Sequence, residues 1–528
     1  MKYRILFAGI VSSLLWACSS STVQTTVSKS LTQGELDQFA NSVEVSYQHV
    51  DNRPDEHCDA NRANGSCFQV EINLEASTDF AAKNWQIYLS HIAPLQSFEN
   101  GELQMKHING DLHRITPSES YQGFKAGQSK SIKFRADGWS VSNSDALPNY
   151  YIVIDGLQPR IIASTKPVID QQTQLETRPF VKPYLYADKE KNFKRLKDEN
   201  TVWATNQQLF SVNKGSYEHA QAIDRAIIPT PKSVTLLKMD SVGKANASLN
   251  LADGIVVNLN HVAHADVQVA LERLGQFGVT INKSMKHGQG VPVNLSVKAD
   301  NSKTASSYKL VVKQSGIEIT GVDAAGVANG LQSLASLVTL GKTTIPLVEV
   351  EDEPRYEFRG LHIDVARNFH SKALILKLLD QMAAYKLNKL HLHLADDEGW
   401  RLAIDGLQEL TDIGSKRCFD LSEDTCLLTQ LGSGPTADTP VNGFYTKADY
   451  IEILRAATAR HIQVIPSLDM PGHSRAAVKS MEARYRKFTK LGDKKAAEQY
   501  LLSDPDDTTV YQSIQFYTDN TINAGMPS

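Results

Sequence analysis

The chain has 528 residues, which is too long for one ordinary domain and enough for about three. Hydrophobic residues make up 41% and charged residues 22%, a composition typical of globular proteins. The 55 basic residues are balanced by 59 acidic ones, and no run of Lys or Arg stands out, so we expect no nucleic-acid partner.

The N-terminus is typical of an export signal. A short basic start precedes an apolar run over residues 5–16, which is shorter than a membrane span. The run ends at a cysteine followed by a Ser-rich stretch, a pattern that resembles a bacterial lipobox. We therefore predict a signal peptide with lipobox over 1–18, lipidation of Cys18, and a tether over 19–40. An ordinary signal peptide with an incidental cysteine is the alternative.

The other four cysteines form two close pairs in the sequence. An exported chain meets an oxidising environment, so we expect two disulfides, Cys58–Cys67 and Cys418–Cys426. A zinc site is the weaker interpretation, because neither pair has the CxxC spacing of a structural site.

Residues 41–180 have the pattern of a β-sandwich. Apolar residues alternate with polar ones from Phe68 to Leu74 and from Trp85 to Leu89, and Gly, Asn and Pro separate these short segments. Residues 181–225 are rich in Lys, Asp, Asn and Gln with little periodicity, which indicates a linker with some helix.

Residues 226–353 mix strand and helix patterns and are predicted to form a small α+β domain. Strands are expected over 308–312 and 317–320, and the clearest helix is expected over 324–338, where apolar residues recur at helical spacing.

From 354 to 528 the pattern becomes strand, helix, strand. Strands are expected over 360–365, 389–394 and 462–468, and helices over 371–385 and 449–460. Within the first of these helices, Leu374, Leu378 and Met382 mark the expected buried face. Repeated β/α units predict a (β/α)8 TIM barrel with its site at the carboxyl ends of the strands. Only about three units are visible, and a complete barrel takes roughly 250 residues, so we expect the barrel to be incomplete.

Three polar clusters lie beside these strands. Arg359 offers a planar fork of donors that suits vicinal hydroxyls, and Asp396, Asp397 and Glu398 are acceptors for hydroxyls. Trp400 offers an apolar face for a pyranose ring.

The third cluster contains two residues on either side of a Pro-Gly turn. Asp469 and His473 could lie within hydrogen-bond reach of each other, which would fix the histidine tautomer and raise its pKa.

Each cluster also has a structural interpretation. Arg359 could form an ion pair, the acidic run could be a solvated loop, and Asp469 with His473 could cap the next helix. His391 and His393 could pack within a strand or bind a metal. The coincidence of three clusters at one end of successive strands favours a site.

The clusters Arg-Gly-…-Asp-…-Arg-Asn-Phe, His-Leu-His-Leu-…-Asp-Asp-Glu-Gly-Trp-Arg and Asp-Met-Pro-Gly-His begin at Arg359, His391 and Asp469. In this order and spacing they resemble the first three barrel motifs of glycoside hydrolase family 20. Residues 107–114 are similar to the N-terminal sandwich of bacterial chitobiases, and residues 319–327 to the small domain that precedes the family's barrel.

The resemblance implies a retaining β-N-acetylhexosaminidase that removes terminal N-acetylglucosamine from chitin oligosaccharides such as chitobiose, without a metal or other cofactor. Such enzymes use the acetamido oxygen of the substrate as nucleophile. Arg359 and Asp396, with Asp397 and Trp400, would bind the sugar. The two residues that would support the catalytic pair electrostatically are Asp469 and His473.

One departure from the family matters. Its catalytic Asp-Glu pair lies in a His-x-Gly-Gly-Asp-Glu stretch after the fourth strand, and no such stretch occurs in these 528 residues. We therefore expect the chain to stop before the catalytic carboxylates and to be inactive alone. Ser467 also stands where the family usually has Glu.

Two other functions are possible. The chain could be a non-catalytic, lipid-anchored protein that binds chito-oligosaccharides, or a metal-dependent hydrolase that uses His391 and His393. The export signal predicts an outer-membrane lipoprotein or a periplasmic protein of a Gram-negative bacterium, with membrane contact only through the lipid.

Overall fold

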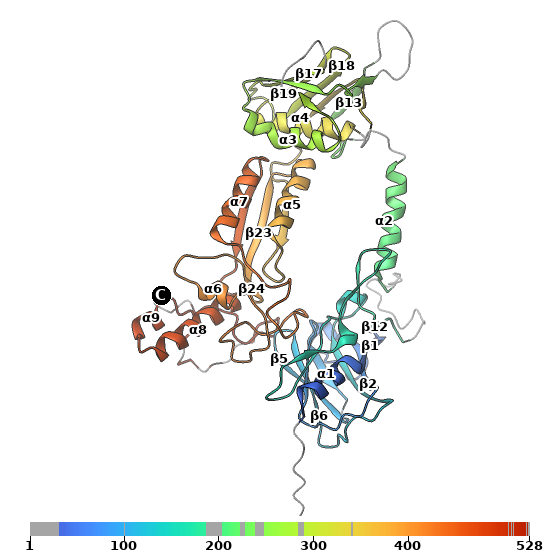
Figure 1. Ribbon diagram of the computed structural model, residues 1–528, viewed down its shortest axis with the longest axis vertical. Helices are drawn as coiled ribbons and strands as arrows, with labels where there is room; N and C mark the ends of the chain where they lie inside the picture. The colour runs from blue at the N-terminus through green and yellow to red at the C-terminus, as the bar shows by residue number, and fades with distance from the viewer. Residues whose placement is uncertain are drawn as a thin grey trace, which may run out of the picture.

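The computed structural model describes residues 31–99, 101–185, 203–221, 227–237, 248–282, 290–338, 342–504, 506–507, 509, 512–523 and 525. The predicted signal peptide with Cys18, the start of the tether and part of the linker lie outside these residues. Figure 1 shows three parts: an N-terminal domain, a small domain at the opposite end of the molecule, and a third part between them. No helix within the described ranges is long and apolar enough to cross a bilayer.

The N-terminal domain contains two five-stranded sheets around one hydrophobic core. The first sheet has the order β12 (Val181–Lys182), β1 (Val43–Asp51), β2 (Cys67–Ala76), β7 (Gln128–Asp137), β4 (Leu95–Phe98). The second has the order β5 (Leu103–Asn109), β6 (Leu112–Pro117), β3 (Gln86–Ser90), β8 (Tyr151–Val153), β9 (Arg160–Ile161). The alternation predicted from Phe68 to Leu74 is confirmed, since both end residues and the two alternate residues between them are at most 3% exposed. A short hairpin of β10 (Val168–Ile169) and β11 (Glu176–Thr177) lies beside the sheets.

Helix α1 (Gln33–Ser42) lies where the tether was expected. It begins with a capping box and buries Leu36 and Phe39, and the ring of Phe39 stacks on Phe80 at a centroid distance of 4.0 Å. The prediction of a tether over 19–40 is therefore wrong for its last residues. The helical spacing of a few apolar residues outweighs the polar composition of this stretch.

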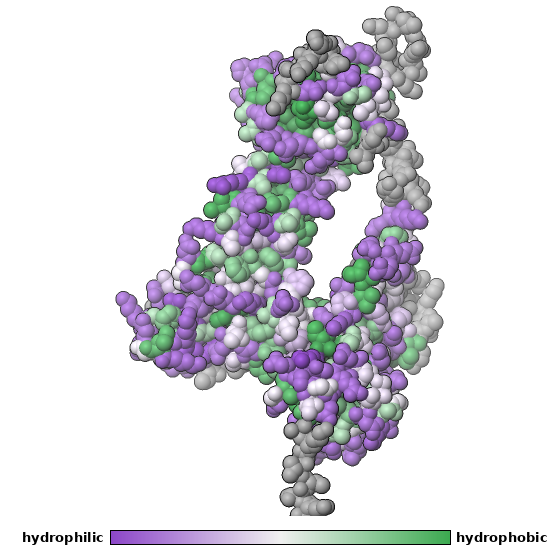
Figure 2. All heavy atoms as spheres, in the orientation of Figure 1, coloured by the Kyte–Doolittle hydropathy of each residue, from purple (hydrophilic) through white to green (hydrophobic). Residues whose placement is uncertain are grey.

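The sandwich also extends beyond residue 180. Strand β12 pairs in parallel with β1, and Tyr184 and Trp203 pack into the same core. Helix α2 (Asn206–Gln221) then leads away toward the small domain. In the space-filling view an opening separates α2 from the third part (Figure 2).

The small domain is a seven-stranded mixed sheet covered by two helices, α3 (His264–Gln276) and α4 (Ala324–Leu337). The sheet order is β13 (Ser233–Leu236), β21 (Val348–Asp352), β18 (Tyr308–Lys313), β19 (Gly316–Gly321), β17 (Val291–Val297), β15 (Ile255–Asn260), β16 (Ile281–Asn282). A separate pair is formed by β14 (Ser248–Asn250) and β20 (Thr344–Pro346). The two strands and the helix predicted here are confirmed as β18, β19 and α4.

The third part contains three parallel strands, β22 (Gly360–Asp364), β23 (Lys389–Asp396) and β25 (Gln463–Leu468), with β23 in the middle. The short strand β24 (Gly399–Trp400) pairs antiparallel with the end of β23. The remaining elements are helices α5 (Lys372–Ala384), α6 (Glu409–Asp412), α7 (Lys447–Thr458), α8 (Arg475–Lys490) and α9 (Lys494–Glu498). The predicted strands and helices are confirmed, including the caps at Ser371 and Thr446.

The buried face of α5 differs from the predicted one. Leu374 is 43% exposed, whereas Ile375, Leu379 and Met382 are at most 1% exposed. The buried face of the helix is therefore shifted by one residue from the predicted face. Between Leu374 and Leu379 every residue except Lys377 is apolar, so the sequence allowed either face.

Both expected disulfides are present in the structure. Cys58 is bonded to Cys67 and Cys418 to Cys426. The second disulfide closes a loop between α6 and α7, and Glu423 in this loop pairs with Arg475 on α8.

Candidate functional site

The register of the three parallel strands brings polar side chains to one edge. Asp364 on β22 lies opposite His393 on β23, and His393 lies opposite Ser467 on β25. All three lie near the carboxyl ends of their strands, where β/α proteins place their sites. Asp396, the last residue of β23, is the centre of the cluster.

Asp396 is the acceptor for four donors. Its side chain is 1% exposed, and Arg367 Nη2 lies 2.7 Å from Oδ2. His393 Nε2 is 3.0 Å from Oδ2, and His473 Nδ1 is 3.0 Å from Oδ1. The backbone N–H of Asp397 donates to Oδ1 at 2.7 Å. A buried carboxylate needs such partners, because desolvation without them is costly.

These contacts determine the charge state of the cluster. Burial acts to raise the pKa of Asp396, but the hydrogen bond from His393 and the charge of Arg367 outweigh it and hold the pKa below its ordinary value. The hydrogen bond to Asp396 raises the pKa of His393. The site is therefore an ionised carboxylate surrounded by cationic or polarised donors.

The next two acidic residues point into the interior and not toward a ligand. Asp397 Oδ1 accepts the backbone N–H of Arg475 at 3.1 Å, and its Oδ2 accepts Asn520 Nδ2 at 3.1 Å. Burial raises the pKa of Asp397 to about 6. Glu398 Oε1 accepts the hydroxyl of Tyr517 at 2.9 Å, and burial raises its pKa as well. Both oxygens of Asp397 therefore bind protein groups in this structure, and its role in sugar binding stays a prediction.

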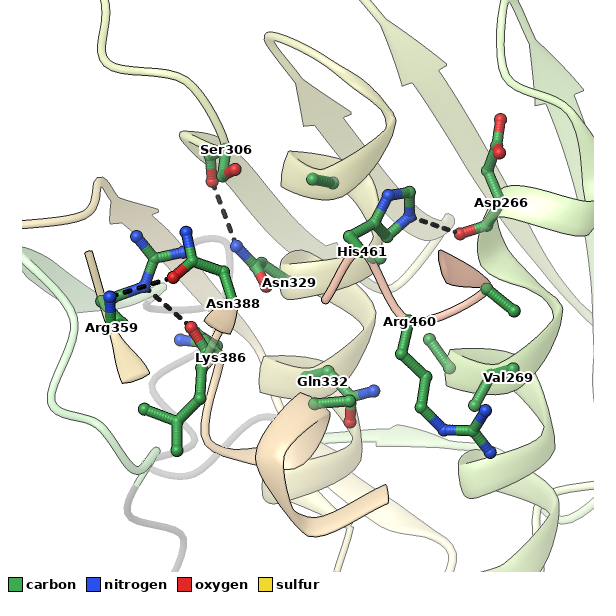
Figure 3. A pocket seen from close by; sticks show the side chains of 16 residues that line it. Asp266, Val269, Ser306, Asn329, Gln332, Arg359, Lys386, Asn388, Arg460 and His461 are labelled. Carbon is green, nitrogen blue, oxygen red and sulfur yellow. Dashed lines mark hydrogen bonds between the residues drawn. The ribbon is translucent and has the colours of Figure 1, made fainter. Parts of the chain in front are cut away.

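Arg359 immediately precedes β22, at the end of the strand opposite to Asp364. Figure 3 shows it beside Lys386 and Asn388. Its Nε donates to the carbonyl of Lys386 at 2.8 Å, and its Nη1 donates to the carbonyl of Tyr356 at 2.9 Å. It lines a small cavity between the third part and the small domain, together with residues such as Asn388 and His461. The structure therefore does not bring Arg359 together with Asp396, since Arg359 precedes the strand and the Asp396 cluster lies at the other end.

Arg367 is the arginine of the site, and the sequence interpretation missed it. It follows β22 and contacts Asp364 at 2.5 Å as well as Asp396, and its Nε lies 3.7 Å from Glu398. Its side chain is 41% exposed, so it can reach a ligand. Its place three residues after the strand end was the signal that could have identified it.

Trp400 does not present its face to this cluster. It packs with Leu410 and Met481 in an apolar cluster between α6 and α8, and its Nε1–H donates to the carbonyl of Leu402 at 2.6 Å. The predicted sugar platform is therefore a packing residue in this structure.

The third predicted pair is only partly brought together. His473 contacts Asp396 and also lies 3.3 Å from Asp397 Oδ2, while no hydrogen bond joins the described side chains of Asp469 and His473. Asp469 is exposed, with a carboxylate oxygen within 4.8 Å of ligand atoms of His393 and Asp396. Its carboxylate adds negative charge at the rim of the cluster.

The two strand histidines bind one hydroxyl. His391 Nε2 and His393 Nδ1 lie 2.8 and 2.9 Å from Ser467 Oγ. The other nitrogen of His393 binds Asp396, so both of its ring positions have partners. These contacts give the histidines a role in ordering the strand ends. Asp396, Asp397 and His473 also lie close enough to bind a cation.

Comparison with known families matches the three parts in order. Residues 42–207 match a domain described as "Putative carbohydrate binding domain". Residues 224–353 match "Glycosyl hydrolase family 20, domain 2", and residues 356–528 match "Glycosyl hydrolase family 20, catalytic domain". The chain belongs to glycoside hydrolase family 20, the family of the β-hexosaminidases.

Several relatives are bacterial enzymes of this family. The chain is 45% identical to a β-hexosaminidase from Vibrio vulnificus, over 94% of this chain and 57% of that protein. It is 35% identical to N,N'-diacetylchitobiase from Vibrio harveyi, over 100% of this chain and 57% of that protein. The chain thus spans little more than half the length of these relatives.

A solved family member has the same fold. The exo-β-N-acetylglucosaminidase from Vibrio harveyi in complex with N-acetylglucosamine superposes with a TM-score of 0.65 at 23% identity. The superposition covers 92% of this chain and 64% of that one.

Proposed function

We propose that the chain carries the sugar-holding part of a β-N-acetylhexosaminidase of the chitobiase type, which acts on terminal N-acetylglucosamine of chitin oligosaccharides. The observation that carries the proposal is the arrangement of Arg367 and His473 around Asp396 at the carboxyl ends of parallel strands. The names of the relatives, and the N-acetylglucosamine bound to a solved one, support the same class of substrate.

Arg367 and Asp396 have distinct proposed roles. Arg367 is 41% exposed and Asp396 is 1% exposed, so an incoming ring meets the guanidinium first. Arg367 donates to hydroxyls of the non-reducing sugar, a task that suits its fork of donors. Asp396 holds Arg367 and His473 in position. Arg367 thereby replaces Arg359 in the role that the sequence resemblance implied.

We further propose that the three strands and their helices are units of a β/α barrel, and that the reaction is retaining and substrate-assisted. That reaction needs a Glu to protonate the leaving oxygen and an Asp to orient the acetamido group. The 528 residues contain no His-x-Gly-Gly-Asp-Glu stretch, and Asp397 and Glu398 are 1% and 8% exposed. We expect the 528-residue chain alone to bind the sugar without hydrolysing it.

Titration of the 528-residue chain with N-acetylglucosamine by calorimetry tests the site. We expect saturable binding that Arg367→Ala weakens at least about tenfold, because a charge-assisted hydrogen bond contributes roughly 1.5–3 kcal/mol. Arg359→Ala is the matched control, since it removes the same side chain at the other end of β22. Equal binding by wild type and Arg367→Ala would show that the ring does not contact Arg367.

Hydrolysis of a chromogenic N-acetylglucosaminide tests the catalytic part of the proposal. A general acid accelerates a reaction by a factor of about 10² to 10⁴, so we expect no turnover by the 528-residue chain alone. Measurable turnover that Asp396→Asn abolishes would overturn the proposed inactivity while supporting the site.

A second candidate is a protein that binds chito-oligosaccharides without cleaving them, and the match of residues 42–207 to a carbohydrate-binding domain favours it. In that case oligosaccharide binding would survive Arg367→Ala.

The proposed location of the protein is the outer membrane or periplasm of a Gram-negative bacterium, through a lipid on Cys18. Incorporation of labelled palmitate that Cys18→Ser abolishes is the expected result. Equal labelling of both forms would contradict it.

A further inference from the structure

The turn between β5 and β6 of the N-terminal domain reaches the residues that surround the candidate site. Gly110 in this turn has a φ of +58°. A Cβ added there would lie 2.3 Å from Cε1 of Tyr517 and 2.8 Å from Oε1 of Gln430. Only glycine fits this approach, because any side chain would collide with the Tyr517 ring.

Gln430 holds one side of the turn. Its Nε2 donates to the carbonyl of Asn109 at 3.0 Å, and its Oε1 accepts the N–H of Asp111 at 2.8 Å. The N–H of Leu431 donates to Asp111 Oδ2 at 2.7 Å. Gln430 is 1% exposed, so these bonds are shielded from water and strongly constrain the geometry.

The segment 512–523 holds the other side. Asn109 Nδ2 donates to Asp519 Oδ1 at 3.0 Å, and its Oδ1 accepts the N–H of Thr518 at 3.2 Å. The N–H of Gly110 donates to the carbonyl of Phe516 at 3.2 Å.

The same segment contacts the acidic residues that follow β23. Tyr517 donates to Glu398, and Asn520 donates to Asp397. The backbone N–H of Asp397 in turn donates to Asp396. Hydrogen bonds, linked through the backbone of residues 516–520, therefore connect the N-terminal domain to the centre of the sugar site.

We propose that the turn Asn109-Gly110-Asp111 is a positioning element of the sugar site. It holds residues 512–523 against residues 396–398 and thereby fixes the orientation of Asp396 and of the groups that Asp396 holds. The N-terminal domain then forms part of the frame of the site and is more than a separate binding module. This inference rests on the proposed function of the site.

The test uses Gly110→Ala in the 528-residue chain. Gly127→Ala is the matched control in the same domain, because Gly127 has a φ of +76° and no heavy atom lies within 4 Å of an added Cβ. Both variants carry similar backbone strain, and only the first pushes on Tyr517.

Two quantities are measured: hydrogen exchange of residues 396–398 and 512–523, and the affinity for N-acetylglucosamine. We expect Gly110→Ala to speed exchange in both segments and to weaken binding at least about tenfold, since a displacement of 1 Å can cost about 10²-fold in function. Gly127→Ala should leave both unchanged. Equal exchange in the two variants would overturn the proposal.

A second variant covers the case in which Gly110→Ala disturbs the whole N-terminal domain, which faster exchange in β2 and β7 would reveal. Gln430→Glu keeps the size of the side chain but places an oxygen opposite the carbonyl of Asn109. It should loosen residues 512–523 while β2 and β7 keep their protection, and unchanged exchange in 512–523 would overturn the proposal. If wild type binds no N-acetylglucosamine, the proposed function fails, and the exchange data still decide whether the turn positions these residues.

Discussion

The N-terminal sandwich and the third part of the molecule, the three-stranded part, differ in the side chains that they bury. The sandwich core is apolar, and burial lowers the pKa values of its histidines His49, His91 and His113 to about 3, 4 and 3, so they stay neutral. The three-stranded part buries charges, such as Arg475, which is 1% exposed beside Glu423 and Asp519. An apolar core tolerates small shifts, whereas buried charges require exact partners, and the proposed site lies in the second kind of interior.

Acid should produce the largest difference between the two parts. The folded-state pKa values of His49, His91 and His113 lie below the ordinary 6.5, so stability is full above about pH 6.5 and is lost as the pH falls toward 4. Each unit of pKa difference between the folded and unfolded states corresponds to about 1.4 kcal/mol of stability, and all three histidines contribute in the same direction.

Asp397 should respond in the opposite direction. Its pKa is raised to about 6, so its contribution to stability is full below the ordinary carboxyl value of 3.8 and is lost as the pH rises through 6. Hydrogen exchange by segment, corrected for intrinsic rates, should show the sandwich loosening between about pH 6.5 and pH 4 before the three-stranded part does. His91→Gln should move the sandwich transition to lower pH. Simultaneous loosening of both parts would remove the distinction.

Removal of a buried charge should have the next largest effect. Arg475→Met leaves Glu423 and Asp519 without their buried partner and should lower the free energy of unfolding by about 3–5 kcal/mol. Arg486→Met is the control on the same helix, because its pair with Asp424 is 35% and 42% exposed and should contribute at most about 1 kcal/mol. Denaturant unfolding measures both variants. Similar losses of unfolding free energy would show that the buried ion pairs stabilise the fold no more than the exposed pair does.

A small change in the apolar core should have the smallest effect. Ile72 is fully buried in β2, and Ile72→Val should cost about 0.5–1.5 kcal/mol, through the loss of one methylene and a small cavity. Val168→Ala, at a side chain that is 50% exposed, should change the unfolding free energy by less than about 0.5 kcal/mol. A loss for Ile72→Val as large as that for Arg475→Met would erase the contrast between the two interiors.

The regular elements were largely predictable because several signals agreed. Around β22, β23 and β25, apolar runs of strand length alternate with helices whose caps, Ser371 and Thr446, are explicit in the sequence. Helix α1 escaped prediction because its buried stripe is only a few residues wide in a polar stretch.

The site was predictable as a region but not residue by residue. The motif that contains both Arg359 and Arg367 indicates the correct strand, and only the direction of that strand distinguishes the two arginines. Trp400 illustrates a second limit, because an aromatic residue near a site can equally pack against a helix. Tyr517 and Asn520 carried no sequence signal, since their partners lie 119 and 123 residues away.

The hydrogen bond between Asn109 and Asp519 joins residues 410 positions apart. Domains generally fold as units, so a folded sandwich presents the turn at Asn109 in its final form when residues 512–523 dock on it. Residues 512–523 then arrive at a prepared surface and need not find their conformation alone. Contacts of such long range are slow to form, so in refolding from denaturant residues 512–523 should gain protection from hydrogen exchange after the sandwich strands do.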